Sequence, residues 1–388
     1  MNNVVTLSEC CAFIKDGTHG SPVRTPGGIP VLSAAHVRDG RLHFDTDRFT
    51  SEEEFLTFQK RLKPVPGDVL LTIVGTIGRT AIIDRDKPFV FQRSVCVLRP
   101  KKNVVISTYL KSALESDAVK SQFHVEKHEV AQAGIYLEAL NEIKIPLPSL
   151  PEQARVTTPI DKADRLRRTR RYALELTDSF LPAAFLELFG DPVTNQKGWK
   201  VSPFGEVAPS RLGKMLDANQ QTGRHGRPYL RNENVQWDRF DLTEVSVMDF
   251  DADDREAFLL SPGDLLICEG GEPGRCAIWR GELPESYFQK ALHRARPVLS
   301  KAIPEYLVHL LWSLSRKGGL NDYVTSATIA HLTGEKLKLM PIPVPPLPLQ
   351  QKFAGLVERV ERLRAVQREA LRQAEHLFAS LLHRAFSG

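Results

Sequence analysis

An internal duplication constrains the fold of this chain more than any other feature of its sequence. The segment GDVLLTIVGTIGRTAII, from Gly67 to Ile83, recurs as GDLLICEGGEPGRCAIW, from Gly263 to Trp279, with eight of seventeen positions identical and no gap. Further along, IPLPSLPEQ at 145–153 recurs as IPVPPLPLQ at 342–350, at an offset of 197 and with six of nine positions identical. Because a sequence that repeats at a fixed spacing repeats its structural unit, we predict two similar domains.

The length of 388 residues agrees with two domains, since single hydrophobic cores rarely grow beyond about 250–300 residues. In each repeated segment an apolar, β-branched run is interrupted by two glycines, which predicts a buried strand, a tight turn and a return strand. Between such anchors the halves diverge, above all in 10–66 compared with 207–262. We therefore expect two domains with a shared frame and different surfaces.

Each half ends in a long helical pattern after a proline-rich entry. In the second half, apolar residues recur at alternating intervals of four and three positions, and Gln367 takes the one polar place in the series. The apolar residues are Leu356, Val360, Leu363, Ala370, Ala374, Leu377 and Leu381. The same positions in the first half are more polar: Pro159, Ala163, Leu166, Arg170, Ala173, Thr177, Phe180 and Ala184. Such seams are typical of coiled coils, although either could be ordinary core packing. We predict helices near 152–188 and 348–385, antiparallel if the halves are related by a two-fold axis, with Pro159 and Pro182 kinking or shortening the first.

Composition narrows the classes of protein to which the chain can belong. Its longest apolar stretches are shorter than the roughly 18–20 residues of a membrane-spanning helix, and no secretory signal is visible. Five cysteines without a CxxC pair favour reduced, buried thiols and a cytoplasmic protein: Cys10, Cys11, Cys96, Cys268 and Cys276. The net charge of +5 is compatible with a nucleic-acid partner.

Through these motifs and their order, the chain resembles the specificity subunit of type I restriction-modification systems. The resemblance covers essentially the whole chain and is carried by the paired GD hairpins, IPLPSLPEQ, SFLPAAFLELFGDP (179–192), PYLRNENVQ (228–236) and TIAHLTGEKLKLMPIPVPPLPLQQ (328–351). It implies an α+β fold with a pseudo-two-fold internal repeat. Two target-recognition domains, each a mixed β-sheet with helices, would be separated by two long antiparallel coiled-coil helices.

The same resemblance implies the division of labour. Residues 1–149 and 193–346 would be the recognition domains, and 150–192 and 347–388 the spacer helices. Each domain would read one half of a bipartite site in double-stranded DNA. The helices would set the gap and bind methyltransferase subunits, two copies by family expectation, through which restriction subunits join. S-adenosylmethionine is expected in the methyltransferase, with no cofactor in this chain and no membrane partner.

Residues that can contact phosphates or base edges lie in the divergent loops, because Arg and Lys recognise phosphate and guanine while Asn and Gln recognise adenine. The first domain offers Lys15, His19, Arg24, His36, Arg38, Gln92 and Arg93. The second offers Arg211, Lys214, Arg224, His225, Arg227, Arg231, Asn232, Asn234, Gln289, Lys290 and His293. Any one of them could equally be a solvated surface side chain.

Two further sets of arginines invite a different interpretation. The run RLRRTRR on the first predicted helix could bind phosphates or face solvent, but we favour contact with an acidic partner surface, through Arg165, Arg167, Arg168, Arg170 and Arg171. Arg79 and Arg275 follow the hairpin turns in both halves. Bonds to the frame explain their retention at least as well as phosphate contacts.

Catalytic motifs are not found. GTIGRT and GEPGRC lack the lysine and spacing of a phosphate-binding loop, and neither a GxSxG elbow nor the Asn/Asp-Pro-Pro-aromatic motif of adenine methyltransferases is present. His124 and His128 have helical metal-ligand spacing without a visible third ligand, so a solvated helix face is expected. We predict a chain without catalytic or metal-binding residues. The alternatives are a self-contained DNA-modifying enzyme and a coiled-coil scaffold without sequence reading.

Overall fold

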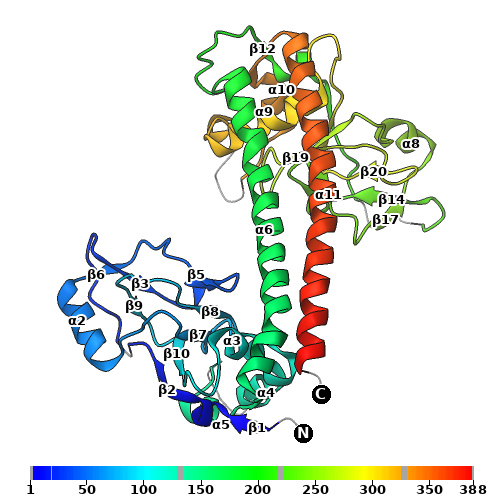
Figure 1. Cartoon of the computed structure of the whole chain (residues 1–388). Coiled ribbons are helices and arrows are strands. Elements are labelled where there is room, and N and C mark those ends of the chain that lie inside the picture. Colours follow the sequence, from blue (N-terminus) through cyan, green and yellow to red (C-terminus); the bar gives the residue numbers. More distant parts are fainter. Residues whose placement is uncertain (1–2, 19, 129–133, 217–221, 325–329, 387–388) are drawn as a thin grey trace. The chain divides into compact units, whose positions relative to one another are not determined.

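The computed structural model describes residues 3–18, 20–128, 134–216, 222–324 and 330–386. It forms two compact units (Figure 1). The first unit comprises residues 1–173 and 367–388, and the second unit comprises 174–366. Each unit therefore contains one globular domain together with part of each of the two long helices.

The first unit is built on two sheets that share its core. The larger sheet is antiparallel, in the order β2 (Cys11–Asp16), β10 (Val95–Pro100), β7 (Val69–Thr72) and β8 (Thr80–Ile82). In the smaller one, β3 (Ile29–Leu32) lies antiparallel to β6 (Phe49–Thr50) and parallel to β9 (Val90–Phe91). Two strand pairs complete the set: β1 (Val4–Thr6) with β11 (Lys144–Pro146), and β4 (Val37–Arg38) with β5 (Arg41–Leu42). The helices are α1 (Leu7–Cys10), α2 (Glu52–Arg61), α3 (Ser107–Glu115), α4 (Asp117–His128) and α5 (Leu137–Glu142).

The second unit repeats this topology. Its larger sheet has the order β13 (Ser210–Leu212), β21 (Leu292–Ala295), β18 (Leu265–Cys268) and β19 (Cys276–Ile278). Its smaller sheet has β14 (Gly226–Leu230) between antiparallel β17 (Ser246–Asp249) and parallel β20 (Tyr287–Phe288). The pairs are β12 (Val201–Pro203) with β22 (Pro341–Pro343) and β15 (Val235–Gln236) with β16 (Arg239–Phe240). The helices are α7 (Phe204–Val207), α8 (Ala252–Phe258), α9 (Pro304–Arg316) and α10 (Gly334–Leu339). The matching strand orders confirm the predicted duplication.

The repeated glycines stand where the backbone requires them. Gly75 and Gly78 adopt φ values of 78° and 89° in the turn between β7 and β8, and Gly271 and Gly274 adopt 75° and 86° between β18 and β19. A Cβ atom disfavours this left-handed region, so glycine is the natural residue at these four places. The predicted hairpins are confirmed.

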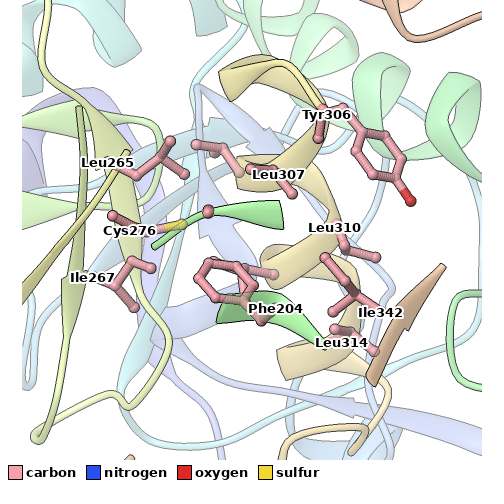
Figure 2. Packing of buried hydrophobic residues seen from close by; sticks show 14 of the residues in the cluster. Phe204, Leu265, Ile267, Cys276, Tyr306, Leu307, Leu310, Leu314 and Ile342 are labelled. Atoms are coloured by element: carbon pink, nitrogen blue, oxygen red, sulfur yellow. The ribbon is translucent and has the colours of Figure 1, made fainter. Parts of the chain in front are cut away.

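Each unit packs a helix against its larger sheet. In the second unit, Leu307, Leu310 and Leu314 of α9 share one buried cluster with Leu265 and Ile267 of β18, and Phe204 and Ile342 belong to the same cluster (Figure 2). In the first unit, α3 occupies the equivalent place against β7. All five cysteines are buried and unpaired, as predicted.

The long helices are α6 (Leu150–Phe189) and α11 (Leu347–Phe386), which confirms the predicted pair. The expected shortening at Pro159 or Pro182 is wrong, because α6 continues through both. The carbonyls that lose a partner, those of Arg155 and Asp178, belong to residues outside the core, where water can bond to them. No helix in the described part of the chain carries an apolar run that could cross a membrane.

Within each unit the two helices pack antiparallel. In the first unit Arg167 lies over Phe378, and Arg171, one turn further along α6, reaches back to Glu375. In the second, the carbonyl of Thr177 accepts from Arg364, and Phe185 contacts Phe353.

The register of the buried face differs from the predicted seam. Val360 and Ala374 are buried as expected, but Leu363 and Leu377 are 46% and 45% exposed. Buried instead are Val357, which follows the predicted Leu356, and Phe378, which follows Leu377. The reason is that α11 buries its face against the globular cores as well as against α6, which rotates the contact away from a two-helix seam.

Candidate nucleic-acid interface

Each unit brings the end of one strand against the turn after its short parallel strand. In the first unit the amide of Thr18 donates to the carbonyl of Phe91 at 2.8 Å, and that of Arg93 donates to Thr18 at 3.1 Å. The second unit repeats this contact: Lys214 donates to Phe288 at 3.1 Å and Lys290 donates to Lys214 at 2.9 Å. This contact gathers predicted DNA-contact residues into one surface in each unit.

Glycine makes this contact possible. A Cβ built on Gly17 would lie 2.3 Å from the carbonyl oxygen of Phe91, and one built on Gly213 would lie 2.3 Å from that of Gln289. Both distances are far below van der Waals contact. Two segments of each unit can therefore meet backbone to backbone, which places the exposed side chains of Arg93 and Lys290 at matched positions.

The surface of the first unit contains Lys15, Gln92 and Arg93, of which Lys15 and Arg93 are exposed. That of the second contains Lys214, Gln289 and Lys290. Lys214 differs from its neighbours because its ammonium pairs with Asp254 and donates to the carbonyl of Asp249 at 2.8 Å. His19 lies outside the described residues.

A carboxylate shapes a second loop in the second unit. Asp249 accepts hydrogen bonds of 2.5–3.0 Å from the amides of Thr222, Gly223 and His225 and from the Thr222 hydroxyl. These donors, the hydroxyl first, hold the pKa of Asp249 below its usual value. The loop is thereby fixed with Arg224 and His225 exposed. Sequence reasoning missed Asp249, because its partners lie 24–27 positions away and no local pattern marks it.

Several candidate cations form ion pairs at the surface. Arg24 pairs with Asp47 at 3.1 Å, Arg38 with Asp45 at 2.6 Å and Arg227 with Glu285 at 3.0 Å, and Arg231 pairs with Glu233. Arg211 is exposed, 5.0 Å from the ring centroid of Phe258. Exposed pairs are worth only about 0–1 kcal/mol, so a phosphate can replace the carboxylate with little loss of stability.

Two predicted DNA contacts are contradicted by burial. Asn234 is 2% exposed; its oxygen accepts from the amide of Arg231, and its nitrogen donates to the carbonyls of Asp241 and Glu244. His293 is fully buried, with Nε2 3.0 Å from the carbonyl oxygen of Leu332, and burial lowers its pKa. Neither side chain has the exposed polar atoms that a base contact needs.

The same turn of the first unit has His36 where the second has Asn234. Its Nδ1 accepts from the amide of Ser33 at 3.0 Å, as the Asn234 oxygen accepts from Arg231. Partial burial lowers the pKa of His36. Asn232, beside Asn234, donates to the carbonyl of Gly270 at 2.8 Å. His36, Asn232 and Asn234 thus hold loops in shape, which their polar character alone did not reveal.

Three of the five helix arginines bond within the chain, which corrects the expectation that this cluster faces a partner. Arg167 and Arg168 pair with buried Asp164 at 2.6 and 3.3 Å, and Arg171 pairs with Asp39 and, at 2.8 Å, with Glu375. Their acidic counterparts come from the turn between β4 and β5, from α6 itself and from α11. Arg165 is exposed and Arg170 half-buried.

Two matched ion pairs beside the hairpins belong to the frame. Arg99 and Arg296 donate through Nε to Asp68 and Asp264, each at 2.8 Å. Arg275 donates to the carbonyl of Asn232 at 3.0 Å and pairs with Glu272 at 3.4 Å, as a frame residue would. Arg79 is exposed. In the described part of the chain, no group of three or more His, Cys, Asp or Glu side chains is arranged to hold a metal ion.

Comparison with known proteins gives the same organisation. The model of the type I restriction modification DNA specificity domain matches residues 2–176 and again 196–375. The EcoBI specificity subunit of Escherichia coli is 30% identical over 195 residues, 48% of this chain and 40% of that protein. The putative MjaX specificity subunit of Methanocaldococcus jannaschii is 22% identical over 407 residues, 98% of this chain and 92% of that protein.

A solved structure shares the fold. The type I restriction-modification S subunit from M. genitalium superposes with a TM-score of 0.59 at 14% identity, covering 99% of this chain and 96% of that one. Its likeness, the two family matches and the duplicated frame agree with one another. The chain belongs to the family of type I restriction-modification DNA specificity subunits, and it carries two copies of the specificity domain.

Proposed function

We propose that the two units of this specificity subunit read the two halves of one divided DNA site. The observation that carries the proposal is the combination of one frame with two different surfaces. Both units make the same glycine-dependent contact, yet they present Arg93 in one case and Lys290 in the other. A loop fixed by Asp249 adds Arg224 and His225 in the second unit. Different side chains on equal frames suit the reading of different half-sites.

The proposed contacts are the predicted residues with accessible polar groups. Arg and Lys side chains of loops and short strands would supply phosphate contacts, and the half-buried glutamines would approach bases. The set comprises Lys15, Arg24, Arg38, Gln92 and Arg93, with Arg211, Lys214, Arg224, His225, Arg227, Arg231, Gln289 and Lys290.

Methylation and cleavage would be done by partner subunits. The second unit has an apolar groove of about 380 Å³ between α6 and α11, lined by Leu176, Thr177, Phe180, Leu356, Arg359, Val360 and Leu363. Leu176, Phe180 and Leu363 remain 46–51% exposed in it. Contiguous exposed apolar side chains favour a protein partner, and we assign the groove to a methyltransferase subunit. That subunit would bind S-adenosylmethionine, and restriction subunits would join through the complex.

The test is a map of methylated bases. The chain is co-expressed with its methyltransferase subunits, and methylation is sequenced genome-wide. We expect a divided motif with a fixed gap. Exchange of residues 1–149 for the matching domain of a relative should change one half of the recognised motif only. Arg155→Gln, at an exposed position of α6, should change neither half.

Three outcomes would contradict the proposal in different ways. A change in both halves after the exchange would exclude independent reading. Methylation by this chain alone would identify a self-contained enzyme. Methylation without sequence dependence would leave only a scaffold.

A further inference from the structure

A polar recess of about 430 Å³ lies in the first unit, where the recognition domain meets the long helices. Five segments line it: β4 with the β4–β5 turn, the β7–β8 hairpin, the α3–α4 region, α6 and α11. The lining residues are Arg38, Asp39, Gly40, Gly78, Arg79, Thr80, Glu115, Lys120, Arg167 and Phe378. Four of these side chains are cationic and two are acidic.

The two acidic groups are already engaged. Asp39 pairs with Arg171 of α6. Glu115 pairs with buried Lys111 at 3.1 Å and accepts a hydrogen bond from the hydroxyl of Thr80. Their charges are therefore compensated within the protein and add little repulsion for an incoming anion.

The cations divide into two kinds. Arg38 pairs with Asp45 at 2.6 Å, and Arg167 pairs with Asp164 at 2.6 Å while its guanidinium lies 4.0 Å from the Phe378 ring centroid. Arg79 and Lys120 are exposed, and neither forms an ion pair among the residues that the structure describes. These two positive charges at one recess are available to an anion from outside.

The duplication supplies an internal comparison. Arg275 stands in the second hairpin where Arg79 stands in the first, and there it bonds to Asn232 and Glu272. Lys317 is the counterpart of Lys120 at the offset of 197, and it pairs with Asp191 at 2.8 Å. The second unit thus neutralises both cations internally, while the described residues of the first unit leave them unpaired.

We infer that this recess binds a phosphate group of the DNA backbone, as an anchor particular to the first unit. A guanidinium offers paired donors to phosphate oxygens and a lysine adds a mobile point charge, a combination suited to a tetrahedral oxyanion. Gly40 and Gly78 present little bulk at its wall, so a protruding phosphate can enter. The inference rests on the proposed function, because it assumes that the bound phosphate is part of the DNA that the chain reads.

Salt dependence of DNA binding tests it. The full chain in complex with its methyltransferase subunits is titrated onto a labelled duplex over a series of KCl concentrations. The slope of log affinity against log salt falls by about 0.9 for each phosphate that the protein no longer neutralises. Arg79→Gln with Lys120→Gln should make the slope less steep by about this value, because one phosphate is lost, whereas Arg79→Lys alone should largely keep the slope and Arg155→Gln should leave it unchanged. Thermal melts of each variant confirm folding.

A second arm uses inorganic phosphate as the probe. We expect it to raise the melting temperature of the parent chain and not that of the double variant. If phosphate stabilises the parent while parent and double variant show equal salt slopes of DNA binding, the recess binds free phosphate. The inference that the phosphate belongs to DNA is then overturned. Equal slopes without phosphate stabilisation overturn the site itself, and equal slopes with weakened methyltransferase binding show an acidic protein surface as its occupant. A parent complex that does not bind DNA would instead refute the proposed function.

Discussion

Asp238 and His309 form a pair of titratable side chains in the second unit, in which His309 is buried and Asp238 is half-buried. Asp238 occupies the turn between β15 and β16 with φ of 58°, and its Oδ2 lies 3.9 Å from Nε2 of His309 on α9. Burial, reinforced by the charge of Glu361, raises the pKa of Asp238 to about 7. Burial, reinforced by Arg364, lowers the pKa of His309 to about 4. Both groups are therefore neutral near pH 6, so this contact is not an ion pair there.

The two groups affect stability in opposite directions. Asp238 contributes stability that is complete below its unfolded pKa of 3.8 and is lost as pH rises through about 7. His309 contributes stability that is complete above its unfolded pKa of 6.5 and is lost as pH falls through about 4. Each group changes the free energy of unfolding by at most about 1.4 kcal/mol per pH unit. Because the two changes have opposite signs, they largely cancel between the folded pKa of His309, about 4, and its unfolded pKa of 6.5.

The variant Asp238→Asn should reveal how His309 alone makes stability depend on pH. Asparagine keeps the size of the side chain and tolerates the left-handed backbone. Thermal unfolding followed against pH should show that the parent loses stability as pH rises through 7 and that the variant does not. Below pH 6.5 the variant should lose stability with falling pH. A charged pair would behave otherwise: the variant would then be destabilised most near pH 6.

At the scale of elements, one glutamine per half connects each long helix to its globular domain. Gln350 is fully buried; its Oε1 accepts from the amide of Ile303 at 3.1 Å, and its Nε2 donates to the carbonyls of Lys301 and Pro345 at 3.1 and 2.7 Å. Gln153 makes the same three bonds in the first unit, to Ile106, Val104 and Pro148. The repeated IPLPSLPEQ motif is thus explained by the frame.

Gln350→Leu should destabilise the second unit strongly. The change leaves one amide and two carbonyls unbonded in the interior, at about 1–3 kcal/mol each, so a loss of about 3 kcal/mol or more is expected. Urea titration followed by tryptophan fluorescence measures it. Gln351→Leu is the matched control, because its neighbour Gln351 is exposed. Equal midpoints for the two variants would show that the buried bonds do not stabilise the unit.

Much of this element structure could be predicted because its signals are local. The glycines of the two hairpins and the apolar steps of the two long helices are visible within a few residues of sequence. The buried face of α11 differs from the predicted seam, since that face depends on cores contributed by distant segments. For the same reason the frame roles of Asn234 and of the arginines of α6 could not be told from surface roles.

At the scale of the whole molecule, both long helices pass from one unit into the other. Insertion of four residues after Glu175 in α6 adds about 6 Å of helix, compared with about 3.4 Å for each base pair of DNA. If the helices set the gap between half-sites, methylation mapping should show a gap longer by one or two base pairs. A four-residue insertion at the C-terminal end of α11 should have no such effect. An unchanged gap in the α6 variant would exclude the helices as spacers.

The sequence by itself determined the duplication, the order of the elements and the two long helices, because repeats, glycine turns and helical periodicity are written in neighbouring residues. Only the tertiary structure decided which polar side chains are available. Asn234, His293 and Arg171 are polar, as Arg93 and Lys290 are, yet the first three are bonded inside their unit and the last two face outward. Whether a donor meets a carbonyl, a carboxylate or water is set by segments far away along the chain.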